Sequence, residues 1–340
     1  MKQNKLHPRW AMLPALALAF SLVVLPVQAA QEGGDSADEL VVMPIAENQS
    51  CYTYADVQMQ GQLRAADPDG GKLTFEVVEQ PKKGTVMLNR DDTAQFVYTP
   101  RGGKTGQDAF TFCAKDEDGN VSDPATVKIE ILKNKSGVRY ADLKDHAAET
   151  AAIRLAEAGV CTGRRVGQEY FFDPNEAVSR SEFLAMAMTA AGIDPSRQVS
   201  VTGFSDDSSI PAWAKSYASE ALHQGLITGK LDHDRVVFSA GEPITYSEAA
   251  VILNRVMAVT DVDAEAFAGE NVPAWAVQSV ANLSSVDLLG SGTDCSTRLN
   301  RAAAAQLLCS AMDLMEESGC NKKCKSTKKR GRNSPSFSYR

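Results

Sequence analysis

The sequence is poor in the residues and motifs that usually carry out catalysis. It has four histidines among 340 residues, and one of them, His7, lies within the first thirty residues. It contains no His-Glu-x-x-His zinc motif, no Gly-x-Ser-x-Gly elbow and no phosphate-binding loop. Acidic pairs such as Asp206-Asp207 fall in repeated loop segments, where turn formation explains them. The sequence therefore predicts a protein that is not an enzyme.

Long apolar runs are absent after the first thirty residues, so we expect no membrane anchor in the mature chain. Residues 1–30 begin with three basic side chains, continue with an apolar run and end in small residues at Val27-Gln-Ala29. This order is typical of a secretory signal peptide. A transmembrane anchor is the alternative, and Pro14 and Pro26, which interrupt the run, disfavour it. We expect a secreted protein.

Basic residues are scarce between the signal peptide and the C-terminal tail. The whole chain has 35 Lys and Arg against 43 Asp and Glu, but eleven of the basic residues lie in those two end segments. The rest of the chain therefore carries a net charge of about −19. Because phosphate backbones are bound by basic surfaces, this balance excludes nucleic acid as a general partner.

The seven cysteines do not have the spacing of a zinc site. Seven is an odd number, so at least one thiol is free or pairs between chains. Cys51 and Cys113 are the two cysteines of the N-terminal half, and export permits a disulfide between them. Strand alternation places Cys113 opposite to Phe110 and Phe112, so such a bridge would be superficial.

Residues 47–133 have the pattern of a small antiparallel β-sandwich, preceded by a flexible leader over 31–46. Apolar and polar residues alternate in Leu73-Thr-Phe75-Glu-Val77 and in Val127-Lys-Ile129-Glu-Ile131. Clusters of Asp, Gly, Pro and Asn separate these runs at intervals of eight to twelve residues. Short strands with one wet face favour an all-β sandwich.

Five segments of this region follow one another in a fixed order. They are Asp67-Pro-Asp-Gly-Gly-Lys-Leu-Thr-Phe75, Pro81-Lys-Lys-Gly-Thr-Val86, Phe96-Val-Tyr-Thr-Pro100, Thr105-Gly-Gln-Asp-Ala-Phe110 and Asp116-Glu-Asp-Gly-Asn120. In these segments the chain resembles the bacterial cadherin-like or Ig-like tandem repeats of large surface adhesins. The resemblance implies a spacer or adhesion module, which can also bind calcium.

Two acidic turns of the sandwich contain the candidate calcium ligands, which are Asp67, Asp69, Asp116 and Asp118. Calcium takes several oxygen ligands at once, and two turns at one end of a sandwich can supply them. The alternative is that Asp, Asn and Gly are there as turn formers. Both interpretations stay open, and nothing in the sequence requires a cofactor.

Three segments of the C-terminal half are imperfect copies of one another, at 140–191, 204–258 and 267–315. Each has a short apolar helix, a Gly-containing turn and a second helix that opens with a four-residue signature. The signatures are Ser179-Arg-Ser-Glu182, Thr245-Tyr-Ser-Glu248 and Asn300-Arg-Ala-Ala303. Such an internal repeat predicts an all-α repeat domain. A basic tail over 317–340 follows, and its composition predicts disorder.

These features, with the Trp-Ala pairs at Trp213 and Trp275, resemble the S-layer homology motif in three tandem copies. The resemblance implies one pseudo-threefold helical domain. It also implies that grooves between the motifs bind secondary cell-wall polymer, a peptidoglycan-linked glycan, and hold the protein on the bacterial wall without a covalent bond.

The signatures have two separable roles. Ser179 with Glu182 and Thr245 with Glu248 have the spacing of capping boxes, and Asn300 is a candidate N-cap. The remaining position holds arginine in two of the three copies, Arg180 and Arg301. A cation at the first helical position is unfavourable for the helix dipole, so helix stability does not explain these arginines. Recognition of an anionic sugar substituent does, and an ordinary surface or ion-pair role is the alternative.

The three copies differ at the positions that would bind a ligand. Tyr246 stands where the other signatures have arginine, and Ala147 stands where the other copies have Trp213 and Trp275. A tryptophan at a repeated position is more often part of a core than a sugar platform, and both roles are open. We therefore expect fewer than three competent grooves.

The sequence thus predicts a binding and display protein at the cell wall or S-layer. The repeats would anchor it, and the sandwich would project as a spacer or meet a surface-protein partner. The alternative is a structural subunit of a self-assembling surface layer.

Overall fold

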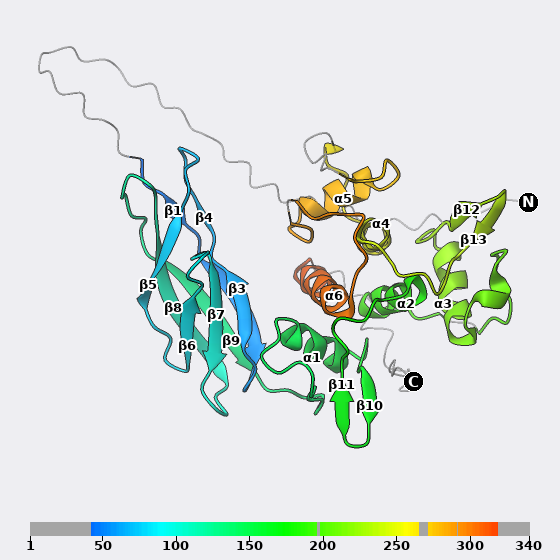
Figure 1. The fold of residues 1–340 in the computed structure, drawn as a ribbon, viewed down its shortest axis with the longest axis horizontal. Coiled ribbons are helices and arrows are strands. Elements are labelled where there is room, and N and C mark those ends of the chain that lie inside the picture. The colour runs from blue at the N-terminus through cyan, green and yellow to red at the C-terminus, as the bar shows by residue number, and fades with distance from the viewer. Residues whose placement is uncertain (1–41, 196–197, 265–270, 291, 319–340) are drawn as a thin grey trace, which may run out of the picture. The chain divides into compact units, whose positions relative to one another are not determined.

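The computed structural model describes residues 42–195, 198–264, 271–290 and 292–318 (Figure 1). The chain divides into two compact units, of which one ends at Lys133 and the other begins at Asn134. The predicted signal peptide over 1–30, most of the leader over 31–46 and nearly all of the basic tail over 317–340 lie outside the described residues. Among the described residues, no helix combines the length and the apolar character that a bilayer crossing needs.

The first unit is a β-sandwich of two sheets. One sheet has the strand order β2-β9-β8-β5 and the other the order β3-β7-β6, and β1 and β4 form a separate pair. The strands are β1 (Ile45–Ala46), β2 (Gln49–Tyr54), β3 (Met59–Gln62), β4 (Ala65–Ala66), β5 (Thr74–Glu79), β6 (Gly84–Leu88), β7 (Gln95–Pro100), β8 (Gly106–Lys115) and β9 (Ala125–Leu132). All neighbouring strands are antiparallel except β2 and β9, which run parallel.

The sandwich core follows the period-two pattern of the sequence. Phe110 and Phe112 on β8 are fully buried, and Phe96 on β7 meets Phe110 edge to face with ring centroids 5.2 Å apart. Gly61 on β3 makes room for this cluster, because a Cβ atom there would lie 2.4 Å from Cζ of Phe96. Together with the helices of the second unit, the sandwich confirms the predicted order of an all-β domain followed by a helical region.

The predicted Cys51–Cys113 disulfide is wrong, because both thiols are free. Cys51 lies on β2 and packs against the core, whereas Cys113 lies on β8 on the face opposite to the buried Phe112 and Ala114. Strand β9 separates β2 from β8 in the sheet. Two cysteines on opposite faces and non-adjacent strands are too far apart to be bridged. Burial raises the pKa of the Cys51 thiol to about 12.

Asp67 and Asp116 stabilise the two acidic turns through hydrogen bonds within each turn. Asp67 accepts hydrogen bonds from the backbone nitrogens of Asp69 and Gly71, and Asp116 accepts them from the backbone and side chain of Asn120. Within the residues that the structure describes, no group of three or more His, Cys, Asp or Glu side chains could hold a metal ion. The predicted calcium site of Asp67, Asp69, Asp116 and Asp118 is therefore not assembled, and turn formation accounts for Asp67 and Asp116.

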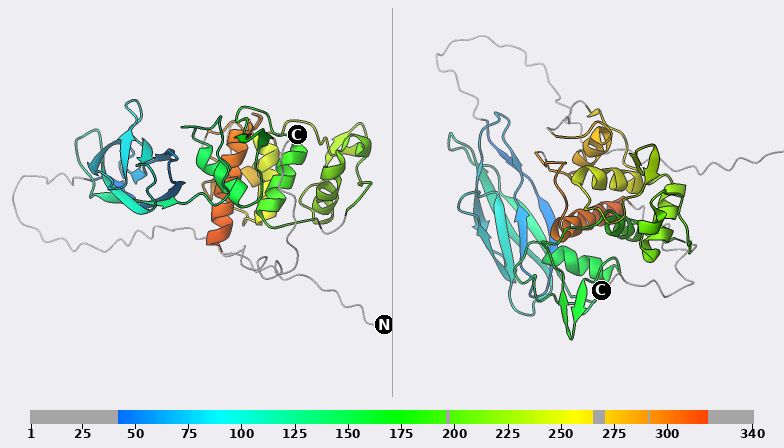
Figure 2. Two further views of the ribbon diagram at one scale, coloured as in Figure 1. Left: turned by 90° about the horizontal axis from the view of Figure 1, so that it is seen from below. Right: turned by 45° about the vertical axis from the view of Figure 1, so that its right-hand side comes forward.

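The second unit contains the three repeats. The first two each have a helix, a β-hairpin and a second helix, and the described part of the third has two helices. The predicted all-α domain is therefore wrong in this detail, because two short hairpins interrupt a mainly helical region. The elements are α1 (Glu149–Glu157), β10 (Arg164–Val166), β11 (Glu169–Phe171), α2 (Arg180–Ala190), α3 (Ala212–His223), β12 (Lys230–Asp232), β13 (Arg235–Val237), α4 (Tyr246–Met257), α5 (Val277–Ser284) and α6 (Arg301–Glu317). Helices α2, α4 and α6 contact one another at the centre of this unit, and Figure 2 shows them side by side.

A cycle of hydrogen bonds joins the three segments that precede these central helices. The backbone nitrogen of Val178 donates to the carbonyl of Leu299, that of Leu299 donates to Ile244, and that of Ile244 donates back to Val178, at 2.9 to 3.1 Å. All three side chains are buried. Equivalent residues of three repeats thus close one ring, which is the arrangement that three sequence copies around a common axis produce.

A second set of contacts binds the start of each central helix to the next repeat. The backbone nitrogen of Arg180 donates to the carbonyl of Glu242, that of Tyr246 to Thr297 and that of Arg301 to Glu176, at 2.8 to 3.0 Å. These nitrogens have no partner within their own helices, so the neighbouring repeat satisfies them. The three repeats therefore fold as one body.

Candidate functional site

The helix starts predicted from the signatures are present. Ser179 Oγ accepts a hydrogen bond from the Glu182 backbone nitrogen at 3.3 Å, and the Glu182 carboxylate accepts one from the Ser179 backbone nitrogen at 2.9 Å. Thr245 and Glu248 form the same reciprocal pair at 3.3 and 3.2 Å. Asn300 caps α6 through Ala303 at 2.8 Å. Each N-cap stabilises its helix by about 1 kcal/mol.

The signature arginines are buried, and each contacts an aromatic ring of another repeat. Arg180 and Arg301 are both 7 % exposed. The guanidinium of Arg180 lies 5.7 Å from the Phe238 ring centre, and that of Arg301 lies 5.1 Å from the Phe172 ring centre. Both arginines therefore have structural contacts, and Arg180 forms the ion pair that was the alternative to ligand recognition. Their chains run inward and join repeats, a tertiary contact that the helix dipole argument does not consider.

The third signature lacks this contact. Tyr246 replaces the arginine. Phe172 and Phe238 each lie six residues before a member of the hydrogen-bond cycle, and in the third repeat Thr293 lies at this position, six residues before Leu299. Tyr246 is partly buried, and its burial raises the pKa of its hydroxyl. The arginine and its aromatic partner are thus both absent from the contact between the second and third repeats.

A groove of about 520 Å³ lies beside α4, and residues of all three repeats line it. The first repeat contributes Arg180, the second contributes the 226–231 segment and one face of α4, and the third contributes Trp275. The groove is therefore formed only when the three repeats assemble. It contains both side-chain types that the sequence singled out for sugar recognition, an arginine and a tryptophan.

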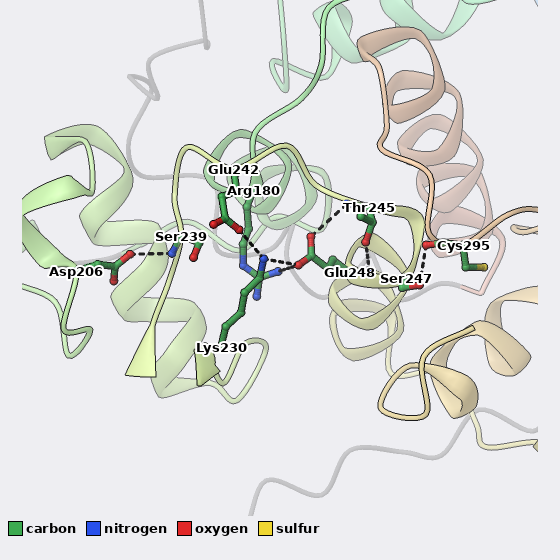
Figure 3. A network of polar contacts seen from close by, with 9 residues as sticks. All are labelled: Arg180, Asp206, Lys230, Ser239, Glu242, Thr245, Ser247, Glu248 and Cys295. Carbon is green, nitrogen blue, oxygen red and sulfur yellow. Dashed lines mark hydrogen bonds and ion pairs between the residues drawn. The ribbon is translucent and has the colours of Figure 1, made fainter. Parts of the chain in front are cut away.

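Arg180, Lys230 and Glu248, which line the groove, form a charge cluster with Glu242 (Figure 3). Lys230 Nζ lies 2.8 Å from the Glu242 carboxylate and 2.7 Å from Glu248 Oε1, and an Arg180 guanidinium nitrogen lies 3.6 Å from the same Glu248 oxygen. Burial lowers the pKa of Lys230, but its hydrogen bonds to Glu242 and Glu248 outweigh burial and raise it. Burial lowers the pKa of Arg180, and Glu248 opposes that shift. The two carboxylates thus neutralise Arg180 and Lys230.

Arg255 is the third cation of the groove and is exposed. Its guanidinium donates to the carbonyl of Leu226 at 3.3 Å, and it forms no ion pair with any residue that the structure describes. The described lining of the groove thus contains three cations and the carboxylate of Glu248, and even with Glu242, which pairs with Lys230, the cations exceed the carboxylates by one. This local excess of positive charge stands out in a chain whose net charge is −8.

The tryptophans lie at the surface. Trp275 is 62 % exposed and lines the groove, and Trp213, its counterpart in the second repeat, is 43 % exposed. Of the two roles that the sequence left open for this position, the exposure of both side chains disfavours the core role. An exposed indole beside a groove presents the flat apolar face on which sugar rings stack.

Sequence reasoning missed Lys230, Glu242 and Arg255. One signal was visible, because a cation directly follows the second glycine of the turn in two repeats, as Arg164 after Gly163 and as Lys230 after Gly229. The structure shows that these two cations have different ion-pair partners. Arg164 pairs with Asp173 at 3.1 Å, whereas Lys230 pairs with Glu242 and Glu248.

Comparison with known proteins matches residues 42–130 to the Bacterial Ig domain family. This supports the Ig-like interpretation of the sandwich. Because the match covers the first unit, it bears on the sandwich and not on the groove.

Two curated proteins are similar to parts of this chain. One is the Surface-layer 125 kDa protein of Lysinibacillus sphaericus, 29 % identical over 134 residues, which are 39 % of this chain and 11 % of that protein. The other is the Exoglucanase XynX of Acetivibrio thermocellus, 30 % identical over 118 residues, which are 34 % of this chain and 10 % of that protein. The chain thus spans about a tenth of the length of these relatives, and it is surface-protein-like in character.

Among solved structures, the SrpA adhesin of Streptococcus sanguinis is 18 % identical, with a TM-score of 0.23, over 30 % of this chain and 64 % of that one. Fibronectin(III)-like modules of CbhA from Clostridium thermocellum are 22 % identical, with a TM-score of 0.20, over 27 % of this chain and 48 % of that one.

Proposed function

We propose that this protein is exported and is held noncovalently on the bacterial cell wall by three S-layer homology motifs, whose groove beside α4 binds an anionic secondary cell-wall polymer. The groove carries this proposal. It combines an excess of positive charge with the exposed indole of Trp275, which is the pairing that an acidic saccharide requires. The Ig-like sandwich serves as a spacer or adhesion module, and the protein performs no catalysis.

The repeats support this assignment through their assembly. A hydrogen-bonded cycle through Val178, Ile244 and Leu299 is the core that a pseudo-threefold domain of three motifs requires. The similarity to a surface-layer protein points to the same cell-surface context. Secretion follows from the signal peptide that the first thirty residues predict.

Cosedimentation with purified walls tests the proposal. The secreted chain should pellet with walls of the source bacterium and stay in solution when hydrofluoric acid has removed the non-peptidoglycan polymer. Trp275→Ala should weaken pelleting about tenfold, because one stacking face is lost. Trp213→Ala is the matched control and should stay within about twofold of the wild type. If the chain does not pellet with intact walls, or pellets equally well with acid-treated walls, wall-polymer anchoring is refuted.

A subunit of a self-assembling surface layer is the second candidate, and the similarity to the Surface-layer 125 kDa protein of Lysinibacillus sphaericus favours it. Electron microscopy of the purified secreted chain separates the two functions. Regular lattices without added wall material would support the array. Monomers that bind walls and form no lattice would support the anchor.

A further inference from the structure

We infer that Arg255, and not the signature arginine Arg180, binds the anionic group of the ligand, and that the groove beside α4 is the single anion site of the three repeats. This inference rests on the proposed wall binding and concerns which residue of the groove performs it. It also sets the stoichiometry at one ligand per chain.

Arg180 is unsuited to bind a ligand directly. Its side chain is 9 % exposed, lies against the Phe238 ring and faces Glu248 at 3.6 Å. A ligand carboxylate would have to displace Glu248, which also caps α4 through the Thr245 backbone nitrogen. Displacement would separate a buried ion pair and disturb this cap, which is unfavourable. Arg180 therefore joins the first repeat to the second and sets the position of Glu248.

Lys230 is closer to the surface, but both of its carboxylate partners are already in place. Glu242 and Glu248 lie 2.8 and 2.7 Å from its ammonium group. The cluster of Arg180, Lys230, Glu242 and Glu248 is therefore neutral in sum. An incoming anion gains little from a pair of charges that already cancel.

Arg255 is the cation that this neutral cluster leaves over. Its one hydrogen bond among the described residues is to the Leu226 carbonyl, so most of its donors are open to solvent. It stands seven residues after Glu248 on α4, about 10 Å along the helix axis from the neutral cluster. An exposed guanidinium can bind a carboxylate or a phosphate through two parallel hydrogen bonds. Trp275 lines the same groove and offers the attached sugar a stacking face.

The other two repeats have no cation at the position that corresponds to Arg255. Arg255 lies seven residues after Glu248, the last residue of its signature. The residues seven after the last signature residue in the other two repeats are Thr189 in α2 and Ser310 in α6. Thr189 donates its hydroxyl hydrogen to the Ala185 carbonyl within its own helix. Helices α2 and α6 therefore lack, at this position, the charge that Arg255 supplies. The groove beside Thr189 is lined by two cations, Lys135 and Arg154, and by two carboxylates, Glu157 and Glu316, so it has no excess of positive charge. Among the described residues, the three repeats thus form one scaffold with one anion site.

Three substitutions in the secreted chain test this inference, with wall binding measured by depletion at several NaCl concentrations. Arg255→Gln should weaken binding about ten- to a hundredfold and flatten its salt dependence, because a charged contact is lost. Arg255→Lys should restore part of the loss. Arg165→Gln removes an exposed arginine on β10, outside the groove, and should bind like the wild type. Thermal unfolding of all three should match the wild type, since Arg255 makes one surface contact.

The outcomes separate this inference from the proposed function. Wild-type protein that fails to bind walls refutes both. Wild-type protein that binds walls while Arg255→Gln binds equally well refutes the role of Arg255 and leaves the anchor in place. Calorimetry with wall polymer released by hydrofluoric acid should give one site per chain, and two or three equal sites would overturn the single-site conclusion.

Discussion

Replacing Glu248 by Gln should destabilise the helical unit by about 3 kcal/mol, because it leaves the buried Arg180 without its carboxylate. The Glu248 side chain is 10 % exposed and that of Arg180 is 9 % exposed, so water cannot replace the lost partner. Lys230 is 34 % exposed and can be hydrated, so it adds little to this cost. A Gln side chain keeps an oxygen that can accept the hydrogen bond from the Thr245 backbone, which limits the change to charge.

Two further variants divide this effect into its parts. Glu248→Ala also removes the cap and should cost about 1 kcal/mol more. Glu182→Gln is the matched control, because Glu182 holds the same capping position in the first repeat, and it should cost less than about 1 kcal/mol. The double variant Arg180→Met with Glu248→Gln removes both buried charges and should be more stable than Glu248→Gln alone.

Urea unfolding followed by tryptophan fluorescence is the assay. Trp213 and Trp275 lie in the helical unit, the sandwich contains no tryptophan, and Trp10 lies in the predicted signal peptide. The fluorescence of the secreted chain therefore reports the helical unit alone. Equal losses for Glu248→Gln and Glu182→Gln, or strictly additive losses in the double variant, would refute the buried ion pair as a stabilising contact.

Two other predictions concern each unit separately. Gly61→Ala should destabilise the sandwich by about 1 to 3 kcal/mol in thermal unfolding, because its Cβ would lie 2.4 Å from the Phe96 ring, whereas Gly102→Ala, whose nearest neighbour is 3.9 Å away, should have almost no effect. Hydrogen bonds from Lys215 and Thr202 lower the pKa of Asp207 to about 2. Its folded pKa is below its unfolded value near 4, so its contribution is complete above about pH 4 and is lost as the pH falls toward 2. The stability difference between wild type and Asp207→Asn should therefore shrink over that window, and a constant difference would contradict the assignment.

Local sequence patterns predicted much of the fold. The alternation in 127–131 placed β9, and the turn clusters separated the strands. The hydroxyl and carboxylate spacing at Ser179 and Thr245 predicted the first residue of α2 and α4. These features are decided by neighbours within a few residues, so a sequence contains them directly.

Most of what the sequence left wrong or open concerns contacts between residues distant in the chain. The Cys51–Cys113 bridge required two strands to be adjacent, and β9 lies between them. The argument that helix stability does not explain Arg180 was correct for an isolated helix but could not include Phe238, 58 residues further along the chain. The choice between a core and a surface role for Trp275 needed the assembled unit, where this side chain is 62 % exposed.

The sequence by itself determined that three related units follow an Ig-like sandwich and that their helices start at capped signatures. Only the tertiary structure decided which cation is available to a ligand. Arg180, Lys230 and Arg255 carry the same charge in the sequence, and they differ only in the carboxylates that other parts of the fold place beside them. The net charge of the groove depends on all the side chains that line it. Because these side chains come from three repeats, that charge exists only once the repeats have come together.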